Sequence, residues 1–333
     1  MTSTAQESFA AVSALSEMWR WDDAVGYELV RSGVSQSLQA SLVSAQLRCL
    51  VRPWMNQRTP VRVQRLLTSL MKWTLPKVKN VVTQRLRLVE QRCDRHAPTH
   101  LTDEETVIVY FHGGGYTLCS PDTHRSLTQL LALDAGMVVY VPEYRLAPEH
   151  AYPAQLDDAQ AFVTSLESQG IDVRKMVFAG DSTGAHLALT LAMHRRDLGQ
   201  SMPRSLVLIS PCVDWTLADL PTRSQDSLLT VGWVTWTRDG YVSPALRSTA
   251  LVSPIHADLH HLPPILIQSS SKELFCLEAQ RLYSGLLAAN VLVTWQEWQG
   301  LWHDFQMHAA LVPEGRDAVR RMARFVRAGI SCP

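Results

Sequence analysis

A serine stands between two glycines at residues 180–184, in the sequence Gly-Asp-Ser-Thr-Gly. This G-x-S-x-G pattern predicts that Ser182 sits in a turn too tight for side chains at the flanking positions. A β-branched run ends at Ala179 and a helical pattern begins at Ala185, so the turn joins a strand to a helix. In that setting the hydroxyl points clear of the sheet, as a nucleophile requires. The alternative is an ordinary glycine turn at the start of a helix.

Three consecutive glycines follow the apolar run Val107–Phe111 and His112. Glycines leave their backbone N–H groups unshielded, which is what a tetrahedral oxyanion requires of its binding site. The residue after the serine would add one more N–H from the start of the helix. A flexible loop explains the glycines alone, but explains poorly why they precede a serine turn in this order. The candidate oxyanion donors are the N–H groups of Gly113, Gly114, Gly115 and Thr183.

A nucleophilic serine needs a base, and the base needs a carboxylate that orients it. His303 follows the run Val291–Trp298, which predicts a loop at the carboxyl end of the last strand. The acid should lie just beyond the run Ile265–Gln268, and Glu273 fits that place. The predicted catalytic residues are therefore Ser182, Glu273 and His303.

Three other acids remain alternatives for the carboxylate, namely Glu278, Asp258 and Asp304. We expect Glu278 to face solvent from the following helix. Asp304 is adjacent to His303 in the chain, and neighbouring residues rarely orient each other's side chains well. A different chemistry is suggested by Ser69-Leu70-Met71-Lys72, which fits the string S-x-x-K. No K-T-G partner follows it, so we interpret that match as coincidence.

The elements that must position these residues can be predicted from residue 100 onward. Short apolar runs that do not alternate with polar residues suit strands buried on both faces, and helical patterns separate most of them. The sequence therefore predicts a mostly parallel sheet wrapped by helices. The runs are Val107–Phe111, Met137–Val141, Met176–Ala179, Leu206–Ser210, Ile265–Gln268 and Val291–Trp298, and the clearest helical stretches are Ala154–Gln169, Ala185–Arg196 and Leu277–Ala289.

Two parts of the chain depart from this alternation. The first hundred residues are predicted to be largely helical, with Trp19 and Trp21 near the start and one early strand at Arg85–Val89. No strand is expected near residues 214–251, a tryptophan-rich stretch that is a candidate lid. We expect residues 1–75 to contribute helices to a cap, and residues 76–333 to form the catalytic domain that carries the insertion.

Composition excludes several classes of function. A chain of 333 residues with 46% hydrophobic content can bury a large core, and its formal net charge of zero removes the electrostatic case for nucleic acid. No signal-peptide pattern is visible, and no apolar run approaches the roughly 18 residues that span a bilayer. We expect a cytoplasmic protein with no stable membrane anchor. A homodimer is compatible with the sequence but not specified by it.

Basic residues heavily outnumber acids between Arg48 and Arg95, where Glu90 and Asp94 are the only acids. The solvated faces of amphipathic helices account for such a stretch, and a membrane-surface role is the alternative. The six cysteines show no C-x-x-C pair and are predicted to be free, mostly buried thiols of a reducing compartment.

Taken together, the motifs resemble those of the hormone-sensitive-lipase-like family of α/β-hydrolase esterases, over roughly residues 105 to 330. The matching segments occur in family order: HGGGY at 112–116, PEYRLAPEH at 142–150, YPA at 152–154 with LDD at 156–158, GDSTG at 180–184, SPI at 253–255 with ADL at 257–259, and Gly300 with His303 and Phe305. Such a set is highly specific.

The resemblance implies an α/β-hydrolase fold with a mostly parallel sheet of about eight strands and a helical cap. It implies no cofactor and no metal, and short- to medium-chain carboxylic esters as small-molecule substrates. Two departures concern the site. The family usually has Ala where Thr183 stands, which suggests an altered pocket shape, and it commonly has Asp where Glu273 stands.

Other functions on the same residues are a lactone hydrolase or a deacetylase of a small metabolite. A non-catalytic small-molecule-binding homologue is a rival from a different class, and the presence of His303 disfavours it.

Overall fold

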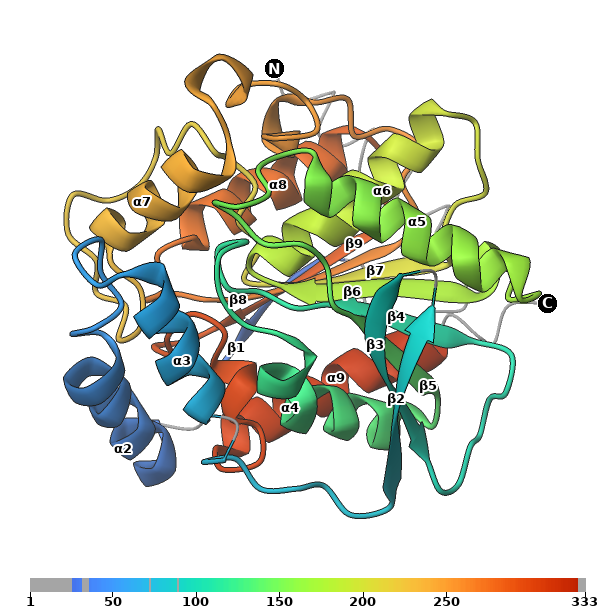
Figure 1. Ribbon diagram of the computed structural model, residues 1–333, viewed down its shortest axis with the longest axis horizontal. Coiled ribbons are helices and arrows are strands. Elements are labelled where there is room, and N and C mark those ends of the chain that lie inside the picture. Colours follow the sequence, from blue (N-terminus) through green and yellow to red (C-terminus); the bar gives the residue numbers. More distant parts are fainter. Residues whose placement is uncertain (1–25, 32–35, 72, 89, 329–333) are drawn as a thin grey trace.

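The computed structural model describes residues 26–31, 36–71, 73–88 and 90–328 (Figure 1). Within these residues nine strands form a single sheet in the order β1-β9-β8-β7-β6-β4-β5-β3-β2. Neighbours from β1 to β5 in that order pair in parallel, and β3 pairs antiparallel with both β5 and β2. The strands are β1 (Gly26–Val30), β2 (Val81–Leu88), β3 (Gln91–Pro98), β4 (Val107–Phe111), β5 (Val138–Pro142), β6 (Met176–Asp181), β7 (Ser205–Ile209), β8 (Ile265–Ser270) and β9 (Val293–Trp298).

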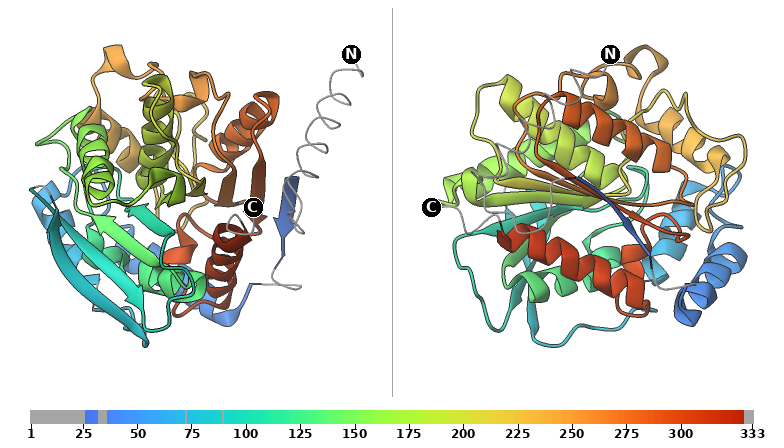
Figure 2. Two further views of the ribbon diagram at one scale, coloured as in Figure 1. Left: turned by 90° about the vertical axis from the view of Figure 1, so that its right-hand side faces the viewer. Right: turned by 180° about the vertical axis from the view of Figure 1, so that it is seen from behind.

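Helices cover both faces of the sheet (Figure 2). Helices α4 and α9 pack together on one face, and α5, α6 and α8 lie on the other. The longer helices are α2 (Leu38–Gln46), α3 (Val61–Met71), α4 (Pro121–Ala135), α5 (Ala154–Ser168), α6 (Thr183–Asp197), α7 (Val231–Tyr241), α8 (Cys276–Ala288) and α9 (Pro313–Ala328). A π-helix spans Leu47–Val51, and short 3₁₀ helices span Val173–Lys175, Pro244–Leu246, Pro254–His256 and Phe305–His308.

The apolar runs form strands because both faces of the sheet are covered. In β4, Val107, Val109 and Phe111 enter the core shared with α5 and α6, while Ile108 and Tyr110 enter the core shared with α4 and α9. Successive side chains of a strand point to opposite faces, so a strand between two helical layers is apolar at every position. The predicted α/β fold and the six strands expected after residue 100 are confirmed, each within about two residues of its expected ends.

The expectation of a largely helical first hundred residues is wrong. The hairpin β2–β3 and the edge strand β1 lie in that stretch, and with them the sheet has nine strands among the described residues, in agreement with the sheet of about eight that the resemblance implies. The hairpin lies at an edge, where charged residues such as Arg85 and Asp94 replace the apolar runs of the central strands. The one strand that was expected in this stretch, at Arg85–Val89, overlaps β2.

Helices α2, α3 and α7 lie together beyond one end of the sheet (Figures 1 and 2). Helix α7 belongs to the stretch 214–251, which contains no strand, as expected. The indole N–H of Trp233 on α7 donates a hydrogen bond to Gln64 Oε1 on α3 at 2.9 Å, so the two parts are joined by a buried contact. Residues 1–25, with Trp19 and Trp21, lie outside the described residues.

Five cysteines fall within the described residues, and all five are free thiols. Cys93 and Cys212 are buried and Cys49 is exposed, so the expectation of mostly buried thiols holds only in part. Cys332 lies outside the described residues.

Candidate active site

Ser182 lies at the turn between β6 and α6, with φ 52° and ψ −118°. A positive φ is strained for a residue with a side chain, and its N–H is held by the carbonyl of Ile209 at 2.8 Å. A Cβ on Gly184 would overlap the carbonyl oxygen of Phe111, and a Cβ on Gly180 would overlap the backbone of Gly184. Both glycines of the motif are therefore required by the close approach of backbone segments.

The three-glycine loop follows β4 and faces the same cavity as the serine. Gly114 and Gly115 line this cavity together with Ser182. The N–H of Gly113, in contrast, donates to Asp181 Oδ2 at 3.1 Å. Of the predicted oxyanion donors, Gly113 is thus occupied in holding the loop. The N–H of Thr183 lies in the first turn of α6, where the helix itself provides no acceptor.

Asp181 is a site residue for which no role was predicted. Its carboxylate is fully buried and accepts hydrogen bonds from the Tyr110 hydroxyl at 2.7 Å and from His124 Nε2 at 3.0 Å, besides Gly113. Burial opposes its charge, but the charge of His124 and these hydrogen bonds outweigh burial and lower the pKa of Asp181. Asp181 is the second residue of the GDSTG motif, so the residue itself is visible in the sequence, but its hydrogen-bond partners are distant in the chain.

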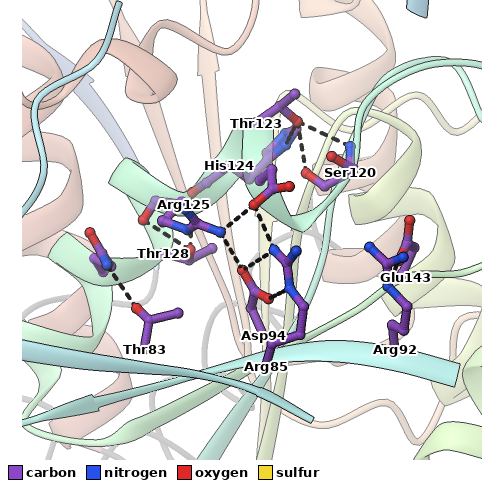
Figure 3. Close-up of polar contacts among 12 residues, drawn as sticks. Thr83, Arg85, Arg92, Asp94, Ser120, Thr123, His124, Arg125, Thr128 and Glu143 are labelled. Carbon is purple, nitrogen blue, oxygen red and sulfur yellow. Dashed lines mark hydrogen bonds and ion pairs between the residues drawn. The ribbon is translucent and has the colours of Figure 1, made fainter. Parts of the chain in front are cut away.

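His124 lies in the first turn of α4, next to Thr123 (Figure 3). His124 Nδ1 lies 2.9 Å from the hydroxyl of Thr123. Beside them, Arg85 and Arg125 both contact the buried carboxylate of Asp94, at 2.9 and 3.1 Å. These contacts fasten the β2–β3 hairpin to α4, and they lower the pKa of Asp94 although its burial alone would raise it. Arg85, which belongs to the basic stretch between Arg48 and Arg95, therefore stabilises the structure beside the site.

Thr183 connects the serine turn to the glycine loop. Its Oγ1 accepts a hydrogen bond from the N–H of Tyr116 at 3.2 Å, and Tyr116 in turn has a positive φ of 55°. The Tyr116 hydroxyl donates to His186 Nδ1 at 2.7 Å, since Nε2 of that ring is bonded to a carbonyl. The Thr183 side chain is buried and is not among the cavity-lining residues. The expected change of pocket shape is therefore wrong, because the side chain points toward the loop.

We expect Thr183→Val to lower kcat by about tenfold to a hundredfold with little change in KM. Valine has the same shape but accepts no hydrogen bond, so the Tyr116 N–H is left buried without a partner and the loop shifts. Thr183→Ser retains the acceptor and should restore most of kcat. Steady-state kinetics on a soluble ester would measure both variants, and a valine variant with unchanged kcat would remove Thr183 from this role.

His303 lies on the loop after β9, buried and on the same cavity as Ser182. Its Nε2 donates to Asp304 Oδ2 at 3.0 Å, and its backbone N–H donates to Asp226 Oδ1 at 3.4 Å. Burial alone would lower its pKa, but neighbouring carboxylates outweigh burial and raise the pKa of His303 to about 9. Those carboxylates belong to Asp304, Glu273 and Asp226.

Glu273 lies just after β8 and is buried. Its Oε2 accepts a hydrogen bond from the hydroxyl of Ser210 at 2.7 Å. Its other oxygen and Nδ1 of His303 are both buried and have no hydrogen-bond partner within the described residues. Burial raises the pKa of Glu273 to about 8, and the charge of His303 opposes this rise. An unpaired acceptor and an unpaired ring nitrogen are chemically complementary, and each of these two groups shifts the pKa of the other.

The alternative acids are placed less well for that role. Glu278 does not face solvent as expected, because its carboxylate is buried and accepts the N–H groups of Val213 and Asp214 at 2.8 and 3.1 Å. Asp258 is exposed and contacts His260. Asp304 contacts His303, but at Nε2, the nitrogen that a serine proton would have to reach.

The cavity beside Ser182 is mainly apolar. Its walls come from the loop at 113–119, from the segment 47–75, from residues 228–233 and from the loop after His303. The apolar side chains are Leu47, Val51, Trp54, Met55, Met71, Leu75, Leu118, Leu228, Leu229, Trp233 and Met307. No cluster of metal-ligating side chains occurs in the part of the chain that the structure describes. Among the same residues, no helix is long and apolar enough to cross a membrane.

Comparison with known proteins identifies the family. A family described by its alpha/beta hydrolase fold matches residues 108–307. LipR of Mycobacterium tuberculosis is 31% identical over 293 residues, which are 87% of this chain and 95% of that protein. The chain belongs to the α/β-hydrolase family. An acetyl-hydrolase of Streptomyces hygroscopicus is 36% identical over 223 residues, or 66% of this chain and 75% of its own.

Solved structures narrow the family to its hormone-sensitive-lipase-like branch. An esterase of the bacterial hormone-sensitive lipase family superposes with a TM-score of 0.82 at 28% identity, covering 90% of this hydrolase and all of that chain. The esterase EstE5, solved after soaking with p-nitrophenyl butyrate, has a TM-score of 0.82 at 26% identity and covers 88% of this chain and 99% of its own. The resemblance drawn from the motifs is thereby confirmed.

Proposed function

We propose that this α/β-hydrolase is a serine carboxylesterase that forms an acyl-enzyme on Ser182. The observation that carries the proposal is the strained serine at the start of α6, which lines the same cavity as His303, Gly114 and Gly115. Relatives named acetyl-hydrolase and esterase support ester hydrolysis as the reaction. The oxyanion donors are the N–H groups of Gly114, Gly115 and Thr183, while Gly113 positions the loop.

The reaction has two acyl-transfer steps. His303 removes the proton of Ser182 as the hydroxyl attacks the ester carbonyl, and the oxyanion is held by the three N–H groups. His303 then gives that proton to the leaving alcohol. A water repeats the sequence on the acyl-enzyme and releases the acid. Glu273 stabilises the imidazolium by accepting a hydrogen bond from Nδ1–H, and for this role the ring must turn so that Nε2 leaves Asp304 and faces Ser182.

The side chains that line the cavity indicate the substrate class. We assign residues 36–75 and the stretch 214–251 to a cap over the catalytic domain, since leucine, methionine and tryptophan side chains from both line the cavity. An apolar wall of this kind suits a short- to medium-chain acyl group or an apolar alcohol. Lactones and acetylated metabolites present the same reacting carbonyl and form the comparison set.

Two measurements test the proposal. A fluorophosphonate probe should label the folded protein at Ser182, found by peptide mass spectrometry, and labelling should be lost after heat denaturation. Hydrolysis of p-nitrophenyl esters should be faster for acetate to octanoate than for palmitate. A lactone panel run in parallel assigns the preferred class. Absence of label on Ser182, with hydrolysis at background, would overturn the enzyme and leave a binding protein.

A further inference from the structure

Helix α3 presents a group of apolar side chains to solvent, and its two fully buried residues are polar. Val63, Leu66, Leu70 and, just past its end, Trp73 are 42, 59, 52 and 75% exposed. Their spacing of three, four and three residues puts them on one side of the helix. The buried residues of α3 are instead Gln64 and Thr68. This is the reverse of a surface helix of a globular protein, whose apolar stripe faces the core.

The buried contacts of α3 fix this orientation. The amide of Gln64 donates to the carbonyls of Asn56 and Thr59 at 3.0 and 2.8 Å and accepts from Trp233. Thr68 donates to the carbonyl of Gln64 at 2.7 Å. Rotating the helix to bury its leucines would break the three bonds of the Gln64 amide and leave the Trp233 N–H without a partner, which is unfavourable for buried polar groups. The Thr68 bond lies within the helix and satisfies its hydroxyl in either orientation. The exposure of the leucines is therefore built into the cap.

Basic residues flank this apolar side in the sequence. Residues 36–80 contain eight lysines and arginines and no acid. Arg58, Arg62, Lys77 and Lys79 are exposed, and none of them enters an ion pair in the described ranges of the chain. The adjacent helix α2 and the π-helix after it add exposed leucines, namely Leu38, Leu42 and Leu50. An apolar helix side with cations beside it is the pattern of helices that lie in the headgroup region of anionic bilayers.

We propose that the outer side of α3, continued by α2, is a docking surface for a bilayer that carries anionic headgroups. A second copy of this chain fits less well, because a two-fold contact would set these cations against themselves.

Docking there would bring the bilayer to the outside of the cap. The inner sides of the same segments carry Leu47, Val51 and Met71, which line the cavity. If the proposed esterase function holds, esters dissolved in the membrane would therefore reach the cavity past these helices. The docking itself does not rest on that function.

The test is co-sedimentation of the full chain with vesicles. We expect binding to phosphatidylglycerol vesicles at low salt to be at least tenfold stronger than to phosphatidylcholine vesicles, and to weaken at high salt. Leu66→Gln with Leu70→Gln should lower the partition coefficient at least tenfold. Arg58→Ser with Arg62→Ser should lower binding to phosphatidylglycerol by about fivefold per arginine.

A matched control is Leu198→Gln with Leu277→Gln, which changes two equally exposed leucines away from the cap and should leave binding unchanged. Hydrolysis of a soluble ester or fluorophosphonate labelling, together with the thermal unfolding temperature, verifies that each variant is folded. Vesicle binding that is absent, or equal in the α3 variant and the control, would overturn the proposal. A concentration-dependent dimer broken only by the α3 variant, without vesicle binding, would assign the surface to a second copy instead.

Discussion

Ser182→Ala is expected to lower kcat/KM for ester hydrolysis by about 10⁴- to 10⁶-fold. The substitution removes the nucleophile and leaves the oxyanion loop in place, because the loop is held through Asp181 and Thr183 and not through the Ser182 hydroxyl. Residual hydrolysis by water with the oxyanion donors would account for what remains. Steady-state kinetics on p-nitrophenyl butyrate, with active-site titration of the wild type, would measure the change.

The strained backbone at Ser182 is expected to lower the stability of the folded protein. A residue with a side chain at φ 52° carries strain of about 1–3 kcal/mol. Ser182→Ala keeps the Cβ and the strain, so its unfolding temperature should match the wild type. Ser182→Gly removes both and should unfold at a higher temperature, by differential scanning calorimetry. Activity within tenfold of wild type in the alanine variant would exclude Ser182 as the nucleophile.

The sequence predicts the parts of this site that depend on local backbone. Glycines at 180 and 184 are needed because backbone segments approach closely there, so the motif is visible without the fold. The central strands are visible for a similar reason, since burial on both faces requires continuous apolar runs. Of the β2–β3 hairpin only part of β2 was expected, at Arg85–Val89, because Arg85 and Asp94 pair across the hairpin and charged pairs leave no apolar pattern.

Contacts between distant segments could not be predicted in the same way. Asp181 joins β4, α4 and the glycine loop through Tyr110, His124 and Gly113, which lie 57 to 71 residues away in the chain. The Glu278 carboxylate was expected in solvent, since the sequence does not show that the loop at 213–214 offers two N–H groups to it. Hydrogen-bond partners of this kind come together only when the strands take their order in the sheet, so the sequence alone does not show them.

The environment of His303 leads to the second large effect. Three buried carboxyl groups surround one imidazole and raise its pKa to about 9, so at pH 7 the charged ring predominates over the neutral ring that a general base needs. We therefore expect kcat/KM to rise with pH up to about 9 in the wild type. A pH–rate profile on a neutral ester, corrected for spontaneous hydrolysis, measures this limb.

Asp304→Asn should move the rising limb to lower pH. Removing a negative charge at Oδ2, 3.0 Å from Nε2, favours the neutral ring and therefore lowers the pKa of His303. The plateau at high pH should stay within about threefold of wild type, since Asp304 lies on the serine side of the ring. At pH 7 the variant should then be faster than the wild type. A plateau that falls a hundredfold would make Asp304 the triad acid.

Glu273→Gln should also shift the limb to lower pH, but with a loss of about 10²- to 10⁴-fold in the plateau. The amide keeps a hydrogen-bonding group beside Ser210 but can no longer stabilise the imidazolium through Nδ1. Asp226→Asn is the matched control, because Asp226 contacts His303 only at its backbone N–H, besides the N–H groups of Leu228 and Leu274. This variant should shift the limb without that loss. The same pH–rate profiles thus assign the partner of each ring nitrogen. The triad acid is the residue whose replacement by the amide lowers the plateau. The residue that competes with Ser182 for Nε2 is the one whose replacement only moves the rising limb.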